Sequence, residues 1–162
     1  MKFSKSLFVG LLLLLCGCRD ETFDQEPREG CEMDKVIKSK APAKAAIVGK
    51  WEWVETTYSS RGAEKVTENP LTTNKTVVYE FERDTLSVYE NDTLAEKLAY
   101  EIRHWGEGTN TVDEQLVIIL RRAKTGEHLG TSIMFLSTAS TCLRLVNSYD
   151  DAGGDMLFKR AD

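Results

Sequence analysis

The sequence predicts an all-β fold, an eight-stranded antiparallel up-and-down barrel that follows a flexible tether. Three observations predict it. From Ile47 onward, short runs alternate apolar and polar side chains with a period of two, which is typical of half-buried strands. Gly, Asn, Asp and Thr interrupt these runs, and no stretch carries a helical stripe of apolar residues. Eight strands that close on themselves leave no exposed sheet edge, which favours a barrel.

Eight strands are expected at residues 50–58, 75–82, 85–90, 93–105, 114–122, 129–136, 141–147 and 155–160. Alternation assigns each side chain to a face. In the fourth strand, the residues expected to share one face are Leu98, Tyr100, Ile102 and His104. In the seventh, Leu143 and Leu145 point inward and Cys142 points outward. The connections after the second, third and fourth strands are short, whereas residues 59–74 form the longest connection.

Composition excludes several classes of function. The chain has 162 residues and a formal net charge of −5, and this acidic balance argues against a nucleic-acid partner. With two His and four Cys, which are scattered, we expect no zinc or other metal site. The chain contains no Gly-x-Ser-x-Gly, His-Glu-x-x-His or phosphate-binding Gly loop. We therefore expect neither an enzyme nor a bound cofactor.

The first residues form a targeting segment. Lys2 and Lys5 precede an apolar run over residues 7–15, which is shorter than the roughly 18 residues that span a bilayer. The run ends in Leu15-Cys16-Gly17-Cys18, which resembles a bacterial lipobox cleaved before Cys18. The resemblance implies a lipoprotein signal peptide over residues 1–17 and a membrane anchor of acyl chains, such as palmitate, at Cys18. The alternative is an ordinary signal peptide with incidental cysteines.

The residues after the lipobox suggest a location. Arg19 is followed by Asp20 and Glu21, and this order resembles the export signal of Bacteroidetes lipoproteins. The resemblance implies an outer-membrane protein displayed on the cell surface. The alternative is a plain polar tether that faces the periplasm.

Residues 18–45 are expected to be the flexible tether, and residues 46–162 the folded domain. The tether is acidic up to residue 34 and lysine-rich from residue 35, with few apolar side chains to offset the entropy of ordering. Signal cleavage and lipidation leave Cys31 and Cys142. An envelope location permits a disulfide between them, and two free thiols are the alternative.

The start of the domain carries a family resemblance. Gly49-Lys50-Trp51 resembles the Gly-x-Trp signature of lipocalins. The late run over residues 133–145, followed by the closing run over residues 156–160, is similar to small lipocalin-like lipoproteins of Bacteroidetes. The resemblance implies that Trp51 closes one end of the barrel and packs against Arg160. A cation over an indole ring contributes about 0.5–2 kcal/mol.

Two functions remain open. The first is binding of a small apolar or amphipathic ligand that enters opposite Trp51, with residues 59–74 as a lid. Its candidate binding residues are Trp53, Glu55, Tyr79, Tyr100 and His104. For Glu55 the alternative is a position at the barrel mouth or past a bulge, because an unpaired buried charge is costly. The second is a filled barrel whose outer surface contacts a protein or a glycan, in which case the same aromatic residues fill the core.

Two threonines are candidate modification sites. Asp84-Thr85-Leu86 and Asp92-Thr93-Leu94 both resemble the O-glycosylation pattern of Bacteroidetes. Ordinary turn chemistry is the alternative for both Thr85 and Thr93.

Overall fold

The computed structural model of the protein describes residues 31, 33, 35–59, 64–108, 113–150 and 153–161. The expected signal peptide, the lipidation site Cys18 and the export signal lie outside the described residues. Within the described part of the chain, no helix combines the length and the apolar character needed to cross a membrane.

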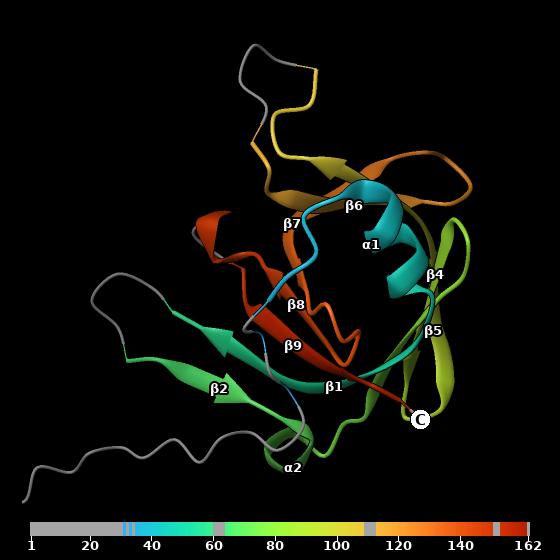
Figure 1. Cartoon of the computed structure of the whole chain (residues 1–162). Helices are drawn as coiled ribbons and strands as arrows, with labels where there is room; N and C mark the ends of the chain where they lie inside the picture. The colour runs from blue at the N-terminus through green and yellow to red at the C-terminus, as the bar shows by residue number, and fades with distance from the viewer. Residues whose placement is uncertain are drawn as a thin grey trace, which may run out of the picture.

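One antiparallel sheet closes into a barrel (Figure 1). Its strands are β1 Gly49–Tyr58, β2 Val66–Glu68, β3 Val77–Phe81, β4 Thr85–Glu90, β5 Thr93–His104, β6 Leu116–Arg122, β7 His128–Leu136, β8 Cys142–Val146 and β9 Asp155–Arg160. From β3 to β9 each strand pairs with the next, and β1 pairs with both β3 and β9. Eight strands therefore close the barrel, and the predicted eight-stranded up-and-down fold is confirmed.

Each predicted strand overlaps one observed strand, but β2 is an addition. It pairs with the last three residues of β1, in the register Thr56↔Glu68 to Tyr58↔Val66. All three residues of β2 are exposed, so no buried face gives its sequence an alternating pattern. The helical turn α2 Pro70–Thr73 follows, and the Asn69 side-chain oxygen caps it by accepting hydrogen bonds from two backbone N–H groups.

The expected extent of the tether is wrong at its C-terminal end. Residues 40–45 belong to helix α1 Lys40–Ile47, and the domain boundary at residue 46 therefore falls inside a helix. Ala43 and Ile47 are fully buried and are four residues apart, so they lie on one face of the helix. Two buried apolar side chains in a helix of eight residues are too few to produce a recognisable helical stripe.

The residues before α1 also pack on the barrel. The backbone N–H of Ile37 donates to the carbonyl of Leu136 at 2.9 Å, and the N–H of Thr138 donates to the carbonyl of Lys35 at 2.9 Å. Residues 35–38 thus lie along the end of β7 and the turn that follows it. Together with α1, they form an N-terminal strap, residues 35–47, that is part of the folded domain.

The core fills the barrel from the end where β1 begins. Its largest fully buried side chains are Trp51, Phe81, Phe158, Ile47, Leu86, Leu116, Ile118, Met134, Leu136 and Leu143. They come from α1 and from seven strands of the barrel. A short 3-10 helix, η1 Ser148–Asp150, lies in the connection between β8 and β9.

Candidate functional site

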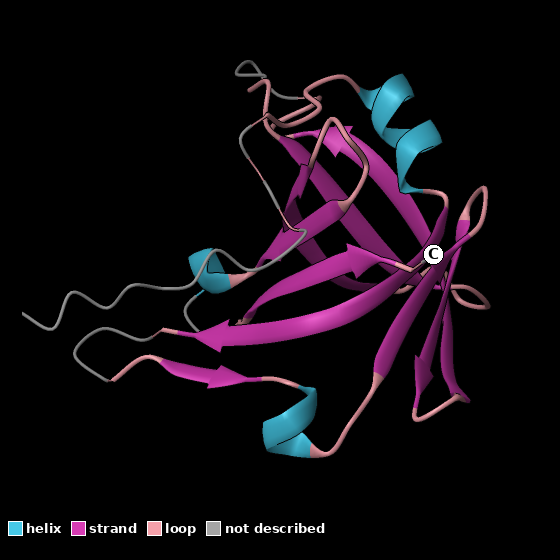
Figure 2. Ribbon diagram, turned by 60° about the horizontal axis from the view of Figure 1, so that its bottom comes forward, coloured by secondary structure: helices cyan, strands magenta, loops and turns pink. Residues whose placement is uncertain are grey.

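The barrel has two ends of different construction. We call the end where β1 begins at Gly49 and β9 stops at Arg160 the closed end. The end where β1 stops at Tyr58 is the open end. Helix α1 lies at the closed end and α2 at the open end, and Figures 1 and 2 show the two helices far apart.

Trp51 seals the closed end. The side chain is fully buried, and its Nε1–H donates to the carbonyl of Ile47 at 2.6 Å. The guanidinium carbon of Arg160 lies 5.1 Å from the centre of the indole ring. The same guanidinium donates to the carbonyls of Ala46 at 2.9 Å and Val48 at 2.6 Å, so Arg160 ties the end of α1 to the plug. The structure therefore places the Trp51–Arg160 pair where the lipocalin resemblance implies it.

Gly49 is required by this arrangement. Its φ of +127° is a conformation that residues with a side chain rarely adopt. A Cβ atom there would also lie 2.9 Å from Nη2 of Arg160. The Gly-x-Trp pattern therefore has a local cause, since the glycine makes room for the arginine that covers the tryptophan.

Ion pairs hold the strap over the closed end. Lys40 Nζ lies 2.7 Å from Glu107 Oε1, and Lys44 Nζ lies 3.3 Å from Asp84 Oδ1. The pKa of Glu107 is lowered, chiefly by the hydrogen bond from Lys40 and next by that from the backbone N–H of His104. These pairs are solvent-exposed, so they contribute little to the stability of the fold. They position the strap more than they stabilise it.

The structure also joins Cys31 to Cys142 in a disulfide. Cys142 pairs with Lys159, so alternation points its side chain outward as expected, yet the residue is fully buried. The chain before the strap is thus attached to the start of β8, at the closed end.

At the open end, neighbouring strands separate. β3 pairs with β1 only over Gly49–Glu52, and β5 pairs with β6 only from Leu98 onward. Residues 93–97 of β5 therefore extend beyond β6. Glu96 pairs with Val88, and Arg122 pairs with Leu98, so alternation directs both charged side chains to the interior face. Both residues are exposed, so this part of the interior face is open to solvent.

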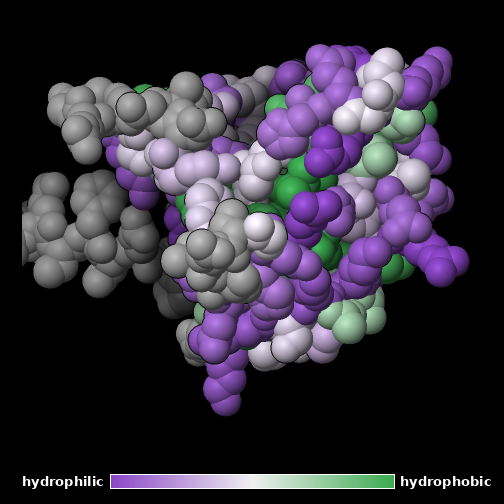
Figure 3. Space-filling view, turned by 90° about the horizontal axis from the view of Figure 1, so that it is seen from above, coloured by the Kyte–Doolittle hydropathy of each residue, from purple (hydrophilic) through white to green (hydrophobic). Residues whose placement is uncertain are grey.

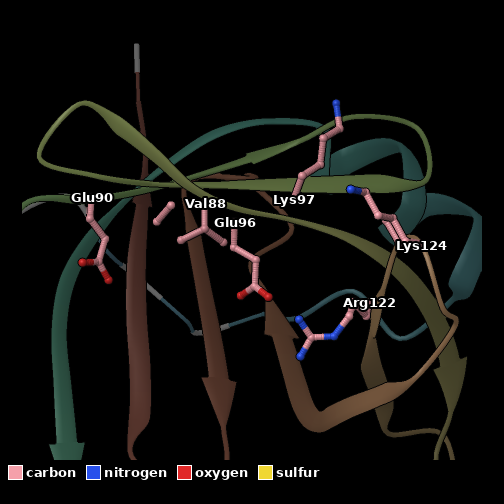
Figure 4. Close-up of a pocket in the computed structure, with 8 residues that line it drawn as sticks. Val88, Glu90, Glu96, Lys97, Arg122 and Lys124 are labelled. Atoms are coloured by element: carbon pink, nitrogen blue, oxygen red, sulfur yellow. The ribbon is translucent and has the colours of Figure 1, made fainter.

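A hollow of about 630 Å³ lies between the β4–β5 hairpin and the turn after β6. It is lined by Val88, Glu90, Ala95, Glu96, Lys97, Arg122, Ala123 and Lys124. In Figure 4, Glu96 hangs below the hairpin and Arg122 points across toward it, whereas Lys97 projects from the other side of the hairpin. Glu96 and Arg122 form no ion pair with each other in the described structure; Arg122 Nε instead lies 3.0 Å from Glu127 Oε2.

Apolar side chains lie between the hollow and the core. The partly buried ones that pack against the core on the open side are Val77, Tyr79, Val88, Leu120 and Met156. Burial raises the pKa of the Tyr79 hydroxyl to about 12, with smaller contributions from the negative charges of Glu96 and Glu90. Tyr79 is therefore a neutral hydroxyl at physiological pH, at the boundary between apolar interior and charged rim.

The rim of the open end is also apolar in part. Six of the eight exposed large hydrophobic residues in the described structure belong to elements at this end, namely Tyr58, Val66, Leu71, Leu94, Leu129 and Tyr149. Leu71, on α2, is 95% exposed. By contrast, the face seen from above Figure 1 shows mainly hydrophilic residues around a small central hydrophobic area (Figure 3).

The five residues predicted to bind a ligand do not form one group. Trp53 is in the core, and its Nε1–H donates to Thr56 Oγ1 at 2.9 Å. Tyr100 is also in the core and donates its hydroxyl proton to the carbonyl of Glu82, at a turn of the closed end. His104 pairs with Leu116 at the closed end, and its Nδ1 is buried without a hydrogen-bond partner in the described structure.

Glu55 does not take the inward position that would let it orient a ligand, and it lies past a bulge, as the alternative expectation has it. A bulge between Trp53 and Glu55 shifts the register, so Glu55 pairs with Leu157 and Thr56 pairs with the inward-facing Met156. Thr56, which is 6% exposed, takes the interior position instead. Of the predicted set, only Tyr79 lies near the hollow.

Glu96 and Arg122 were not among the predicted site residues. The signal that could have found them is their spacing: Glu96 lies two residues before Leu98, and Arg122 two residues after Leu120, on faces that point inward. A charged side chain at an inward position indicates a wet part of a barrel, because an unpaired buried charge is costly.

The two candidate glycosylation threonines differ in accessibility. Thr93 is exposed at the start of β5, after the turn residues Asn91 and Asp92, which both have positive φ. The Thr85 hydroxyl donates to Glu82 Oε2 at 2.8 Å, and this bond is the main cause of a lowered pKa for Glu82.

The described residues contain no group of three or more His, Cys, Asp or Glu side chains that could hold a metal ion. No family model, curated protein or solved structure matches this chain.

Proposed function

We propose that the protein is a membrane-anchored, lipocalin-like lipoprotein that binds a small amphipathic ligand at the open end of its barrel. The observation that carries the proposal is the contrast between the ends. One end is sealed by Trp51, Arg160 and the strap, whereas the other exposes charged inward residues above a layer of apolar side chains. An amphipathic molecule would suit this arrangement of a charged rim above an apolar layer. Its apolar part would contact Val88 and Met156, and its polar part would lie in the hollow.

Binding of a neutral apolar fluorophore, N-phenyl-1-naphthylamine, tests the location. Leu94→Glu replaces an exposed aliphatic residue at the rim of the open end by a charge, and Val48→Glu does the same at the closed end. Leu94 is 52% exposed and Val48 is 40% exposed, so neither change disturbs the core. We expect Leu94→Glu to weaken fluorophore binding and Val48→Glu to leave it unchanged. Equal effects of the two variants, or no fluorophore binding at all, would contradict the proposal.

The anchor is the second part of the proposal. Cleavage before Cys18 and acylation of its thiol would attach the chain to the outer membrane, on the cell surface if residues 19–21 act as an export signal. The Cys31–Cys142 disulfide supports a defined orientation, because it attaches the chain to the barrel at the closed end. The open end would then face away from the membrane.

Two cysteine variants test the anchor. Cys18→Ala should abolish incorporation of an alkyne-labelled palmitate and shift the protein to the soluble fraction. Cys16→Ala, two residues earlier, is the matched control and should change neither result. Protease treatment of intact cells then separates surface display from a periplasmic location. Labelling that persists in Cys18→Ala would refute lipidation at this residue.

An outer-surface interaction with a protein or glycan is the second candidate function. It is favoured by one observation, an aromatic pair on the outside of the barrel. Trp105 and Tyr149 are 39% and 43% exposed, and their rings meet edge to face at a centroid distance of 5.3 Å. If no amphiphile binds the open end and Trp105→Ala removes capture of a surface glycan or protein, this role replaces ligand binding.

A further inference from the structure

We propose that the hollow at the open end recognises a zwitterionic head group, with the ligand's ammonium on Glu96 and its anionic group on Arg122. The inference rests on the proposed function and names the chemistry of the ligand. Its starting point is that the Glu96 carboxylate and the Arg122 guanidinium face each other across the hollow without forming an ion pair with each other (Figure 4).

The charges that line the hollow are already partly neutralised. Glu90 Oε2 lies 3.2 Å from Lys75 Nζ, and Lys97 Nζ lies 3.6 Å from Glu82 Oε2. Within the described residues, Glu96 and Lys124 form no ion pair. The hollow therefore offers one anion without an ion-pair partner, Glu96, and one such cation, Lys124.

Arg122 is the better positioned of the two cations. Its guanidinium points into the hollow, and only Nε is engaged by Glu127 at 3.0 Å. A guanidinium has five N–H donors, so its terminal nitrogens remain able to donate to a phosphate or carboxylate. Lys124 adds a second positive charge on the same wall.

A ligand with a single charge would pair with either the acidic or the basic side chains of the hollow and would leave the others without a partner. A simple fatty acid would bring its carboxylate to Arg122 but would also approach the carboxylates of Glu96 and Glu90. A simple alkylamine would match Glu96 but would face Arg122 and Lys124. A head group that carries both charges satisfies both walls, while its chain contacts Val88 below them.

Displacement of N-phenyl-1-naphthylamine from the Cys18→Ala protein measures this selectivity. The competitors are lysophosphatidylethanolamine, which is zwitterionic, lysophosphatidylglycerol, which is anionic, and an alkylammonium of the same chain length, all below their micelle concentrations. We expect the zwitterion to compete about threefold to fivefold better than either single-charge lipid, which corresponds to about 0.6–1 kcal/mol and lies at the upper end of the range for an exposed ion pair.

Two pairs of variants assign the charges. Glu96→Gln should remove the preference for the zwitterion over the anionic lipid, and Arg122→Gln should remove its preference over the alkylammonium. Glu101→Gln and Arg121→Gln are the matched controls, because these residues are on the same two strands and face the outside of the barrel. Both controls should retain the full selectivity.

The outcomes separate this assignment from the proposed function. If all three lipids displace the fluorophore equally and Glu96→Gln changes nothing, the head-group assignment is overturned while ligand binding stands. If no lipid displaces it, both are overturned. Free phosphoethanolamine should compete at least tenfold more weakly than its lysolipid; equal competition would assign the site to a small polar molecule and overturn the amphipathic ligand.

Discussion

The closed and open ends of this barrel are built from the same strands but differ in what lies beyond them. At the closed end, a helix, an arginine and a disulfide cover the last ring of side chains, and Trp51 is fully buried. At the open end, β5 extends beyond β6, and the inward-facing side chains of Glu96 and Arg122 are exposed. The difference shows that one barrel can be packed and covered at one end while its interior face is open to solvent at the other.

The largest expected effect is at Trp51. Trp51→Ala should lower the free energy of unfolding by about 3–5 kcal/mol, as for other large buried aromatic residues. Trp105→Ala is the control, because that side chain is 39% exposed and should cost less than about 1 kcal/mol. Urea denaturation measures both. Similar losses in the two variants would show that the closed end is not the stable part of the barrel.

Removal of the disulfide is expected to have the next largest effect. The bond joins residues separated by 111 positions, so the Cys31→Ala, Cys142→Ala double variant should lose about 2–4 kcal/mol. Dithiothreitol should bring the wild-type unfolding midpoint down to that of the double variant, which itself should not respond. A wild-type protein that is indifferent to the reductant would mean that the strap is held by its other contacts alone.

The dependence of stability on alkaline pH tests the burial of Tyr79, on the open side of the core. The pKa of Tyr79 in the folded protein is about 12, above the ordinary value of 10.0, because burial disfavours the phenolate. The stability that this burial preserves is complete below pH 10 and is lost as the pH rises toward 12, by about 2 kcal/mol. In Tyr79→Phe, this contribution to the decrease in the free energy of unfolding between pH 10 and pH 12 should be absent. An unchanged pH dependence would indicate that Tyr79 is accessible to water.

Arg160 should have the smallest of these effects. Arg160→Ala removes a cation–π contact and two hydrogen bonds to the end of the strap, and should cost about 1–2 kcal/mol because the residue is exposed. Lys159→Ala, on the neighbouring residue with an exposed ion pair to Glu52, should cost less than about 0.5 kcal/mol. Equal costs would show that covering Trp51 contributes no stability.

The order of strands in the barrel could be predicted from the sequence because alternation is a local property. Each barrel strand buries one face, and side chains two residues apart share that face whatever the neighbouring strand is. The pairing of Trp51 with Arg160 was expected from the resemblance to lipocalins; alternation added only that Arg160 shares a face with Phe158 and Met156. The strap could not be predicted, since Ala43 and Ile47 are buried only because the end of the barrel is beneath them.

The candidate site was decided by tertiary structure. Alternation alone placed Glu55 inside, but the bulge in β1 gives that position to Thr56. Alternation also directs Glu96 and Arg122 inward, yet their exposure depends on where β6 stops relative to β5, which neither strand specifies by itself. The sequence by itself determined which side chains face the interior. Only the lengths and registers of the paired strands decided which part of that interior is packed and which part is open to solvent, because packing depends on residues that are distant in the chain.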